Sequence, residues 1–392
     1  MSFMGYRREN GSVGVRNYVA VISTVWCANE VALRIAEHVE GAVAVTHGMG
    51  CGEYALTPYY PLAGLGKNPN VAAVLVVGLG CELINPKVLA GDIAKTGKPT
   101  EHLVIQDSGG FAKSIEKGVT IIKKMVEDAS RLRREKAELS DVTLALKCGG
   151  SDTTSGIAAN PSLGKAADRI VDAGGTVIMA ETLELVGAQH LLAARAVDER
   201  AASQILKTIG EMETRMTKAF PLPVPLIAPG NIQGGLTTIE EKSLGDSFKS
   251  GSSAIQGMLE YAQIPKRKGL WIMDEVGYDP ESLTGMVAAG AQIVAFTTGR
   301  GTPATYPVVP VIMITGNPKT YRKLGDDIDI NAGTIIDGDD AINDVGRRII
   351  DKVLAVASGE TTKTEPLGHI GPIAIYWPWP IPKVSCSKKN SR

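Results

Sequence analysis

Short, continuously apolar runs alternate with longer segments of helical character along most of this chain. Such runs are typical of parallel strands that are buried on both faces, because helices cover both sides of the sheet. The pattern therefore predicts an α/β fold with Rossmann-like parallel sheets and helices on both faces. Strands are expected at residues 18–24, 42–46, 71–77, 102–106, 142–147, 176–179, 270–273, 292–296 and 311–314, and helices at 28–38, 87–96, 161–173 and 197–220.

A chain of 392 residues can bury enough surface for two or more subdomains. The segment 111–139, which ends in "SRLRREKAEL", is long, basic and helical in character, and it makes a natural joint. We expect an N-terminal α/β domain over residues 1–140 and a C-terminal α/β domain over residues 141–392. The ending "YWPWPIPKVSCSKKNSR" is too rich in proline for a helix interior or a central strand, so it is read as a wrapping or partner-docking arm.

Composition excludes several classes of protein. Lys and Arg total 41 against 42 Asp and Glu, so the net charge of −1 leaves no electrostatic footprint for nucleic acid or for an acidic membrane. No window reaches the roughly 18 uninterrupted apolar residues of a membrane-spanning helix, and no signal-type apolar core opens the chain. We therefore expect a cytoplasmic protein, in which thiols stay reduced and act more often in catalysis or as ligands than in disulfides.

Three of the five cysteines follow apolar runs and stand among glycines: Cys51 in "HGMGCGE", Cys81 in "GLGCE" and Cys148 in "KCGGSD". The carboxyl ends of parallel strands are where ligands gather, so these thiols could meet there. They could hold three corners of a four-iron cluster or, with His47, a single soft metal ion. Alternatively they fill tight turns as small apolar residues. Cys27 is expected to pack near a helix start, and Cys386 to have no special role.

Acid–base candidates are few. His47 lies in the glycine loop of Cys51, although a hydrogen-bonded structural role is the commoner use of such a residue. His190, Glu181 and Glu184 share the segment "ETLELVGAQH" and could transfer protons, but a solvated helix start explains them equally well.

Three further loops carry hydroxyl, amide and cationic side chains where strands end. They are "FTTGRGTP" with Arg300, "KCGGSDTTSG" with Ser151, and "APGNIQGGLTTIEEKSLG" with Asn231 and Lys242. None matches G-x-G-x-x-G or the P-loop pattern, so nucleotide binding is weakly supported. Together the loops favour a pocket for a carboxylate, sulfonate or phosphate.

Read together, the stretches "GYRRENGSVGVRNYVAVISTVWCANEVA", "HGMGCGE", "NPNVAAVLVVGLGCE", "KCGGSDTTSGIAANPSLG", "APGNIQGGLTTIEEKSLG", "MVAAGAQIVAFTTGRGTP" and "DIDINAG" resemble the altronate/galactarate dehydratase family. The resemblance runs in order through nearly the whole chain. It implies a metal-dependent lyase that removes a β-substituent from a 2-hydroxy acid and gives a 2-oxo acid through an enol. Sugar-acid members lose water, whereas a related branch releases sulfite from (2R)-3-sulfolactate.

The resemblance also implies a small SAF-type domain, which is fused at the N-terminus of the sugar-acid enzymes. Because this chain opens at the "GYRRENG" motif, we expect that domain to be a separate small subunit, as in the sulfo-lyase branch. The expected reaction is thus cleavage of (2R)-3-sulfolactate to pyruvate and sulfite in an oligomer. A sugar-acid dehydratase and a non-catalytic anion-binding subunit are the alternatives, while a structural zinc protein or a nicotinamide enzyme is less favoured.

The expected site follows from this chemistry. The metal ligands are Cys51, Cys81 and Cys148, which bind iron as a [4Fe-4S] cluster or as a single Fe2+ or Mn2+ ion. Proton transfer is expected from His47, Lys242 or His190, and Lys242 would need its pKa lowered by burial or by a cation such as Arg300. The residues expected to bind the substrate are Arg300, Thr298, Thr302, Ser151, Asp152 and Asn231.

Overall fold

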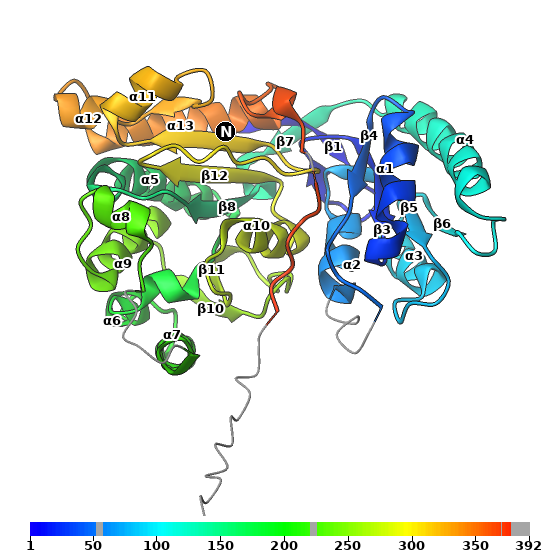
Figure 1. Ribbon diagram of the computed structural model, residues 1–392. Coiled ribbons are helices and arrows are strands. Elements are labelled where there is room, and N and C mark those ends of the chain that lie inside the picture. Colours follow the sequence, from blue (N-terminus) through cyan, green and yellow to red (C-terminus); the bar gives the residue numbers. More distant parts are fainter. Residues whose placement is uncertain (52–57, 220–225, 370, 378–392) are drawn as a thin grey trace, which may run out of the picture.

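The computed structural model describes residues 1–51, 58–219, 226–369 and 371–377. It confirms the α/β class: one parallel sheet has four strands, a second has seven, and a small antiparallel sheet has three. Figure 1 shows two α/β units side by side, each built around one of the parallel sheets.

The four-stranded sheet has the order β4-β3-β5-β6 and is parallel throughout. Helices α1 and α4 pack on one face through a core that includes Val31, Ile35 and Ile122, and α2 and α3 cover the other. The elements are β3 (Tyr18–Ser23), α1 (Asn29–Glu37), β4 (Ala42–Val45), α2 (Tyr59–Lys67), β5 (Val71–Gly78), α3 (Pro86–Ala94), β6 (Thr100–Val104) and α4 (Phe111–Ser130).

The seven-stranded sheet has the order β10-β11-β9-β8-β12-β13-β14. Its strands are β8 (Thr143–Cys148), β9 (Thr176–Met179), β10 (Ile255–Leu259), β11 (Gly269–Met273), β12 (Ile293–Thr298), β13 (Val311–Thr315) and β14 (Ile330–Asn331). Its helices are α5 (Asn160–Asp172), α6 (Gln189–Ala193), α7 (Glu199–Ala219), α8 (Pro229–Gln233), α9 (Ile239–Ser247), α10 (Asp279–Ala288), α11 (Pro318–Leu324), α12 (Thr334–Asp337) and α13 (Ile342–Ala357). Short 3-10 turns cover Trp26–Ala28, Leu139–Asp141, Thr182–Leu185, Phe248–Ser250 and Glu365–Leu367, and a π-helical turn, Ser155–Ala159, precedes α5.

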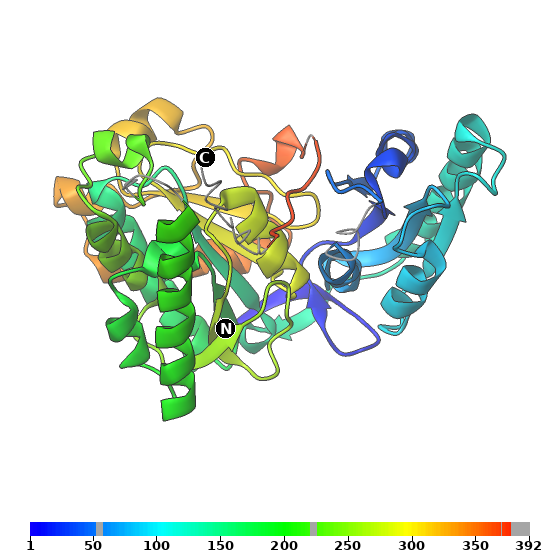
Figure 2. The same cartoon turned by 60° about the horizontal axis from the view of Figure 1, so that its bottom comes forward.

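The two parallel sheets share packing. Helix α2 lies so close to α10 that a Cβ on Gly64 would stand 2.3 Å from the carbonyl oxygen of Ala288. Buried residues of β3, β5, α2 and α10 therefore belong to one continuous core. Between the units, in Figure 1 and Figure 2, lies the antiparallel sheet β2-β1-β7, formed by β1 (Ser2–Arg7), β2 (Val13–Gly14) and β7 (Glu135–Glu138).

The antiparallel sheet departs from the sequence-based expectation. The helix expected over 111–139 ends at Ser130, and residues 135–138 form β7, which pairs with β1. Phe3 and Val13, from the first residues, pack into the core of the seven-stranded sheet. The division at residue 140 stays a prediction, with the opening strands packed on the second unit.

The described end of the chain crosses both units. The amide of Ile373 donates to the carbonyl of Thr46, 2.6 Å away, while the amide of Tyr376 donates to the hydroxyl of Tyr261. Figure 1 and Figure 2 show this segment running between the units. The "PWPIP" portion and Cys386 lie outside the described residues, so the docking role of the ending stays a prediction. Within the described ranges, no helix has both the length and the apolar character that crossing a membrane requires.

Candidate functional site

Buried charge gathers where β8, the central strand of the seven-stranded sheet, ends. Lys147 is completely buried on β8, and Cys148, the next residue, is 1% exposed. The Lys147 ammonium contacts the carboxylate of Glu181, lies 2.7 Å from Asp279 Oδ1 and donates to the carbonyl of Gly277. Burial lowers the pKa of Lys147, but the carboxylates of Glu181 and Asp279 outweigh it and hold that pKa well above its ordinary value.

Glu181 follows the neighbouring strand β9 and is also completely buried. Its backbone is left-handed, with φ 77° and ψ 50°, a conformation that costs a residue with a Cβ about 1–2 kcal/mol. The carboxylate contacts the ammonium groups of both Lys147 and Lys249. A strained backbone that presents a doubly paired carboxylate is typical of a functional position.

Glu275 follows β11, the next strand in the sheet. One oxygen of its carboxylate accepts a hydrogen bond from the Glu181 amide at 2.6 Å, and the other accepts from the Gly277 amide. Burial raises the pKa of Glu275 to about 7. Three neighbouring strand ends therefore contribute ionisable groups to one place, the edge where ligands bind in open α/β sheets.

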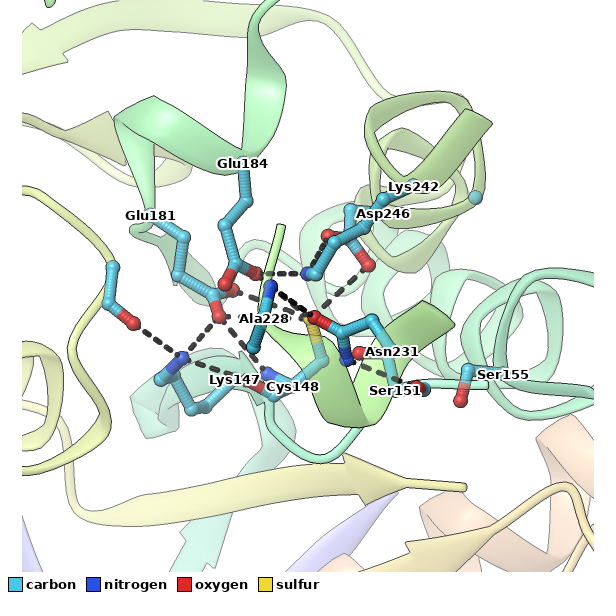
Figure 3. Close-up of polar contacts among 12 residues, drawn as sticks. Lys147, Cys148, Ser151, Ser155, Glu181, Glu184, Ala228, Asn231, Lys242 and Asp246 are labelled. Atoms are coloured by element: carbon cyan, nitrogen blue, oxygen red, sulfur yellow. Dashed lines mark hydrogen bonds and ion pairs between the residues drawn. The ribbon is translucent and has the colours of Figure 1, made fainter. Parts of the chain in front are cut away.

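Helix α9 covers this edge and adds two charged side chains one turn apart. The Lys242 ammonium contacts Glu184 and lies 2.7 Å from Asp246 Oδ2. Lys249, in the following 3-10 turn, places its ammonium 3.2 Å from the Cys148 sulfur. Three buried ammonium groups thus surround Cys148, interleaved with carboxylates, as Figure 3 shows for Lys147 and Lys242.

Cys148, Glu184 and Asp246 could hold a metal ion. Their ligand atoms lie within 4.8 Å of one another, and no other such group occurs among the residues that the structure describes. The Cys148 sulfur is 3.1 Å from Asp246 Oδ1 and 3.5 Å from Glu184 Oε2. Burial raises the pKa of the Cys148 thiol, and Asp246 and Glu181 add to this rise. One thiol and two carboxylates are a donor set that suits a divalent ion between hard and soft, and metal binding would deprotonate the thiol.

The predicted anion loops meet beside this cluster. The side-chain amide of Asn231 donates to the Ser151 carbonyl at 3.0 Å, and the Arg300 guanidinium donates to the carbonyl of Gly230, next to Asn231. A Cβ on Gly150 would lie 2.9 Å from the Thr302 hydroxyl and 3.3 Å from that of Thr298. Figure 3 places Ser151 and Asn231 close to Cys148.

Within these loops the predicted substrate ligands differ in availability. The Ser151 hydroxyl is buried and has no hydrogen-bond partner in the described structure, and the exposed Arg300 forms no ion pair there. Asp152, by contrast, is saturated, because its carboxylate accepts hydrogen bonds from Thr154, Ser155 and Asn317. Ser151 and Arg300 are thus open to an anionic ligand, whereas Asp152 fixes the loop.

The predicted acid–base residues find different surroundings. Burial lowers the pKa of His47 to about 4, and both ring nitrogens bond to backbone: Nδ1 accepts from the Met49 amide and Nε2 donates to the Ser23 carbonyl. His190 is exposed on α6. For Lys242, burial lowers the pKa, but Asp246 and Glu184 outweigh it, so that the pKa lies well above its ordinary value. The lowered pKa that Lys242 would need to act as a base is therefore not what its surroundings favour. The catalytic roles of His47, Lys242 and His190 stay predictions.

The three cysteines expected to share a metal have unlike surroundings. Cys148 is buried among carboxylates in the second unit, while Cys51 and Cys81 are exposed in turns of the four-stranded sheet. Of these three cysteines, only Cys148 belongs to the group of converging ligand atoms in the described residues. The joint site of Cys51, Cys81 and Cys148 therefore stays a prediction.

Sequence reasoning missed Lys147, Lys249, Asp246 and Glu275. One signal was present: a lysine inside the otherwise apolar strand "VTLALKC" must be buried with a counter-charge. Of the two interpretations of Glu181, the solvated helix start is wrong, because its side chain is completely buried, while proton transfer stays a prediction.

Comparison with known proteins places the chain in a family. Residues 5–130 match the profile described as D-galactarate dehydratase/altronate hydrolase, second domain, and residues 139–377 match D-galactarate/altronate dehydratase, C-terminal.

Three relatives show how far the similarity extends. The (2R)-sulfolactate sulfo-lyase subunit beta of Chromohalobacter salexigens is 36% identical over 94% of this chain and 95% of its own length. The altronate dehydratase of Bacillus subtilis is 34% identical over 93% of this chain and 75% of the relative. The galactarate dehydratase (L-threo-forming) of Escherichia coli is 34% identical over 97% of this chain and 77% of the relative. This chain belongs to the D-galactarate/altronate dehydratase family of lyases.

Proposed function

We propose that this chain is the large subunit of a metal-dependent lyase that converts (2R)-3-sulfolactate into pyruvate and sulfite. The observation that carries the proposal is the convergence of Cys148, Glu184 and Asp246 at the ends of parallel strands, beside loops suited to an anion. The sulfo-lyase branch is favoured because the sulfo-lyase beta subunit is 36% identical to this chain, against 34% for each of the two dehydratases. That relative is named as a beta subunit, which supports a separate small partner chain.

The reaction breaks two bonds on adjacent carbons. The proton leaves C2, the C3–S bond breaks, and its electron pair departs with sulfite, which leaves enolpyruvate to become pyruvate. In the dehydratase alternative, a hydroxyl group leaves as water from a sugar acid by the same β-elimination. Both versions develop negative charge on the substrate's C2 side, and stabilising that charge is the main catalytic demand.

The residues fit the metal that this chemistry calls for. Cys148, Glu184 and Asp246 would hold a divalent ion, Fe2+ or Mn2+, which when bound supplies a Lewis acid for the carboxylate and 2-hydroxyl of the substrate. The Cys148 thiol would lose its proton to bind the ion, and the Lys249 ammonium, 3.2 Å from the sulfur, would balance the thiolate charge.

The remaining roles fall to this chain's own side chains. Arg300, the Thr298 and Thr302 hydroxyls and the unpartnered Ser151 hydroxyl bind the carboxylate and sulfonate. Lys242, kept protonated by Asp246 and Glu184, suits proton donation better than proton removal. We assign proton acceptance from C2 to Asp279, whose side chain is 32% exposed and so within a substrate's reach.

The test is a product assay on the chain, alone and with a small partner subunit, loaded anaerobically with Fe2+ or Mn2+. Equal amounts of pyruvate and sulfite from (2R)-3-sulfolactate support the proposal. A 2-oxo acid from altronate or galactarate without activity on sulfolactate would move the chain to the dehydratase alternative. Substrate binding without any product would favour a non-catalytic anion-binding subunit.

A further inference from the structure

Three exposed thiols lie along one edge of the four-stranded sheet. Cys27, Cys51 and Cys81 are free and exposed, and they follow β3, β4 and β5, respectively. These strands are neighbours in the order β4-β3-β5, and all run parallel. All three thiols therefore lie at the carboxyl edge of adjacent strands. Free cysteine is among the most buried residue types, so three exposed thiols on one edge need an explanation.

Hydrogen bonds fix the turns after β3 and β4 relative to each other. The amide of Trp26, next to Cys27, donates to the carbonyl of Met49 at 2.9 Å. The Asn29 side chain donates to the carbonyl of His47 at 2.8 Å, while the His47 ring accepts from the Met49 amide. His47 thus acts as a positioning residue for the turn that carries Cys51.

The turn after β5 is fixed in the same way. The Thr24 hydroxyl, at the end of β3, donates to Glu82 at 2.6 Å. The Glu82 carboxylate also accepts from the amides of Leu79, Gly80 and Cys81, at 2.9, 2.7 and 2.9 Å. The three turns that carry the thiols are thus held together as one unit.

Two glycines near Cys51 face open space among the residues that the structure describes. A Cβ on Gly48 or Gly50 would meet no described atom within 4 Å, and neither glycine adopts a positive φ. Neither packing against the described residues nor backbone conformation accounts for them. Close approach of a bound group does, because glycine lets the backbone come near a bulky ligand.

The thiols are spread too widely for a single ion. Two sulfurs on one zinc ion are at most about 4.6 Å apart, since each Zn–S bond is about 2.3 Å. Adjacent strands lie about 4.8 Å apart, so side chains from three strands spread further. In agreement, Cys27, Cys51 and Cys81 are absent from the compact ligand groups of the described residues. A four-iron cluster offers separate iron atoms to separate thiolates and so fits a wider set.

We propose that Cys27, Cys51 and Cys81 bind an iron–sulfur cluster at the carboxyl edge of the four-stranded sheet. Each thiol gives up its proton and binds one iron, so that three of four irons carry cysteine. His47 supplies no ligand to the fourth, because both of its ring nitrogens bond to backbone. Cys27 thus takes the place of Cys148 among the three cluster ligands expected from the sequence, and Cys148 belongs to the buried site with Glu184 and Asp246.

The test is anaerobic reconstitution of the full chain with ferrous iron and sulfide, followed by iron and acid-labile sulfide determination and a visible spectrum. Wild type and Cys148→Ser should both bind about four acid-labile sulfides and about four cluster irons, with one further ferrous ion at the Cys148 site in wild type only, whereas Cys27→Ser should lose most of the sulfide and of the cluster iron. Loss of the cluster in Cys148→Ser with full retention in Cys27→Ser would overturn the proposal. So would a wild-type chain that takes up no iron and sulfide.

A second measurement needs no variant. Alkylation followed by mass spectrometry should label Cys27, Cys51 and Cys81 rapidly in the cluster-free chain and slowly after reconstitution. Buried Cys148 is the internal control and should stay unlabelled in both states. Equal labelling of Cys27 before and after reconstitution would contradict the cluster. Because elimination is assigned to the Cys148 site, a failed product assay leaves both cluster readouts interpretable.

Discussion

Replacing Glu181 by Gln should destabilise the protein strongly, because one carboxylate neutralises two fully buried ammonium groups. It contacts Lys147 and Lys249, and all three side chains are 0% exposed. The glutamine keeps the shape but leaves buried positive charge without its partner, which typically costs about 3–5 kcal/mol. At about 2–4 °C per kcal/mol for a unit of this size, the melting temperature should fall by about 6–20 °C.

Chemical unfolding followed by circular dichroism measures this change, and two controls sharpen it. Glu30→Gln breaks an exposed pair with Arg34, which solvent screens, and should leave the free energy of unfolding nearly unchanged. Combining Glu181→Gln with Lys249→Met should cost less than the sum of the single changes by roughly 1–3 kcal/mol, since both remove one interaction. A Glu181→Gln protein as stable as Glu30→Gln would refute the assignment of Glu181 as the shared counter-charge.

Three further predictions follow from the same geometry. Arg300→Ala should raise KM for an anionic substrate by roughly 10- to 100-fold, the value of one charge-assisted hydrogen bond, and an unchanged KM would remove Arg300 from the pocket. His47→Asn keeps an acceptor for the Met49 amide but removes the titration. Burial lowers the His47 pKa from 6.5 to about 4, so the free energy of unfolding of the wild type should fall by about 3 kcal/mol as the pH drops from above 6.5 to below 4. The free energy of unfolding of His47→Asn should fall by less, and parallel curves of stability against pH would contradict this. Lys242→Met should lower kcat more than it raises KM, and steady-state kinetics with the opposite pattern would make Lys242 a binding residue.

The strands of the parallel sheets could be predicted because their apolar runs are local signals. β5 and β8, for example, read directly as buried strands, and the structure confirms them. β7 could not be predicted in this way, since "EKAE" is polar and becomes a strand only by pairing with β1, some 130 residues away. Long-range pairing overrode the helical propensity of that segment.

The site shows the same limit. Cys148 could be picked out because a thiol among glycines at a strand end is conspicuous in the sequence. Its actual neighbours, Asp246, Glu184 and Lys249, come from segments 36 to 101 residues away. The charged residues that each cysteine contacts depend on the sheet that its strand joins. Local sequence patterns do not contain that information.

The central claim is that Cys148, Glu184 and Asp246 hold the ion used for elimination. Its most direct test is an anaerobic Mn2+ titration followed by electron paramagnetic resonance, because Mn2+ does not build an iron–sulfur cluster. Wild type and Cys81→Ser should bind one Mn2+ per chain with similar affinity, while Asp246→Asn should bind it at least 10-fold more weakly and lose elimination activity in parallel. Wild-type affinity in Asp246→Asn would contradict the claim and place the metal elsewhere.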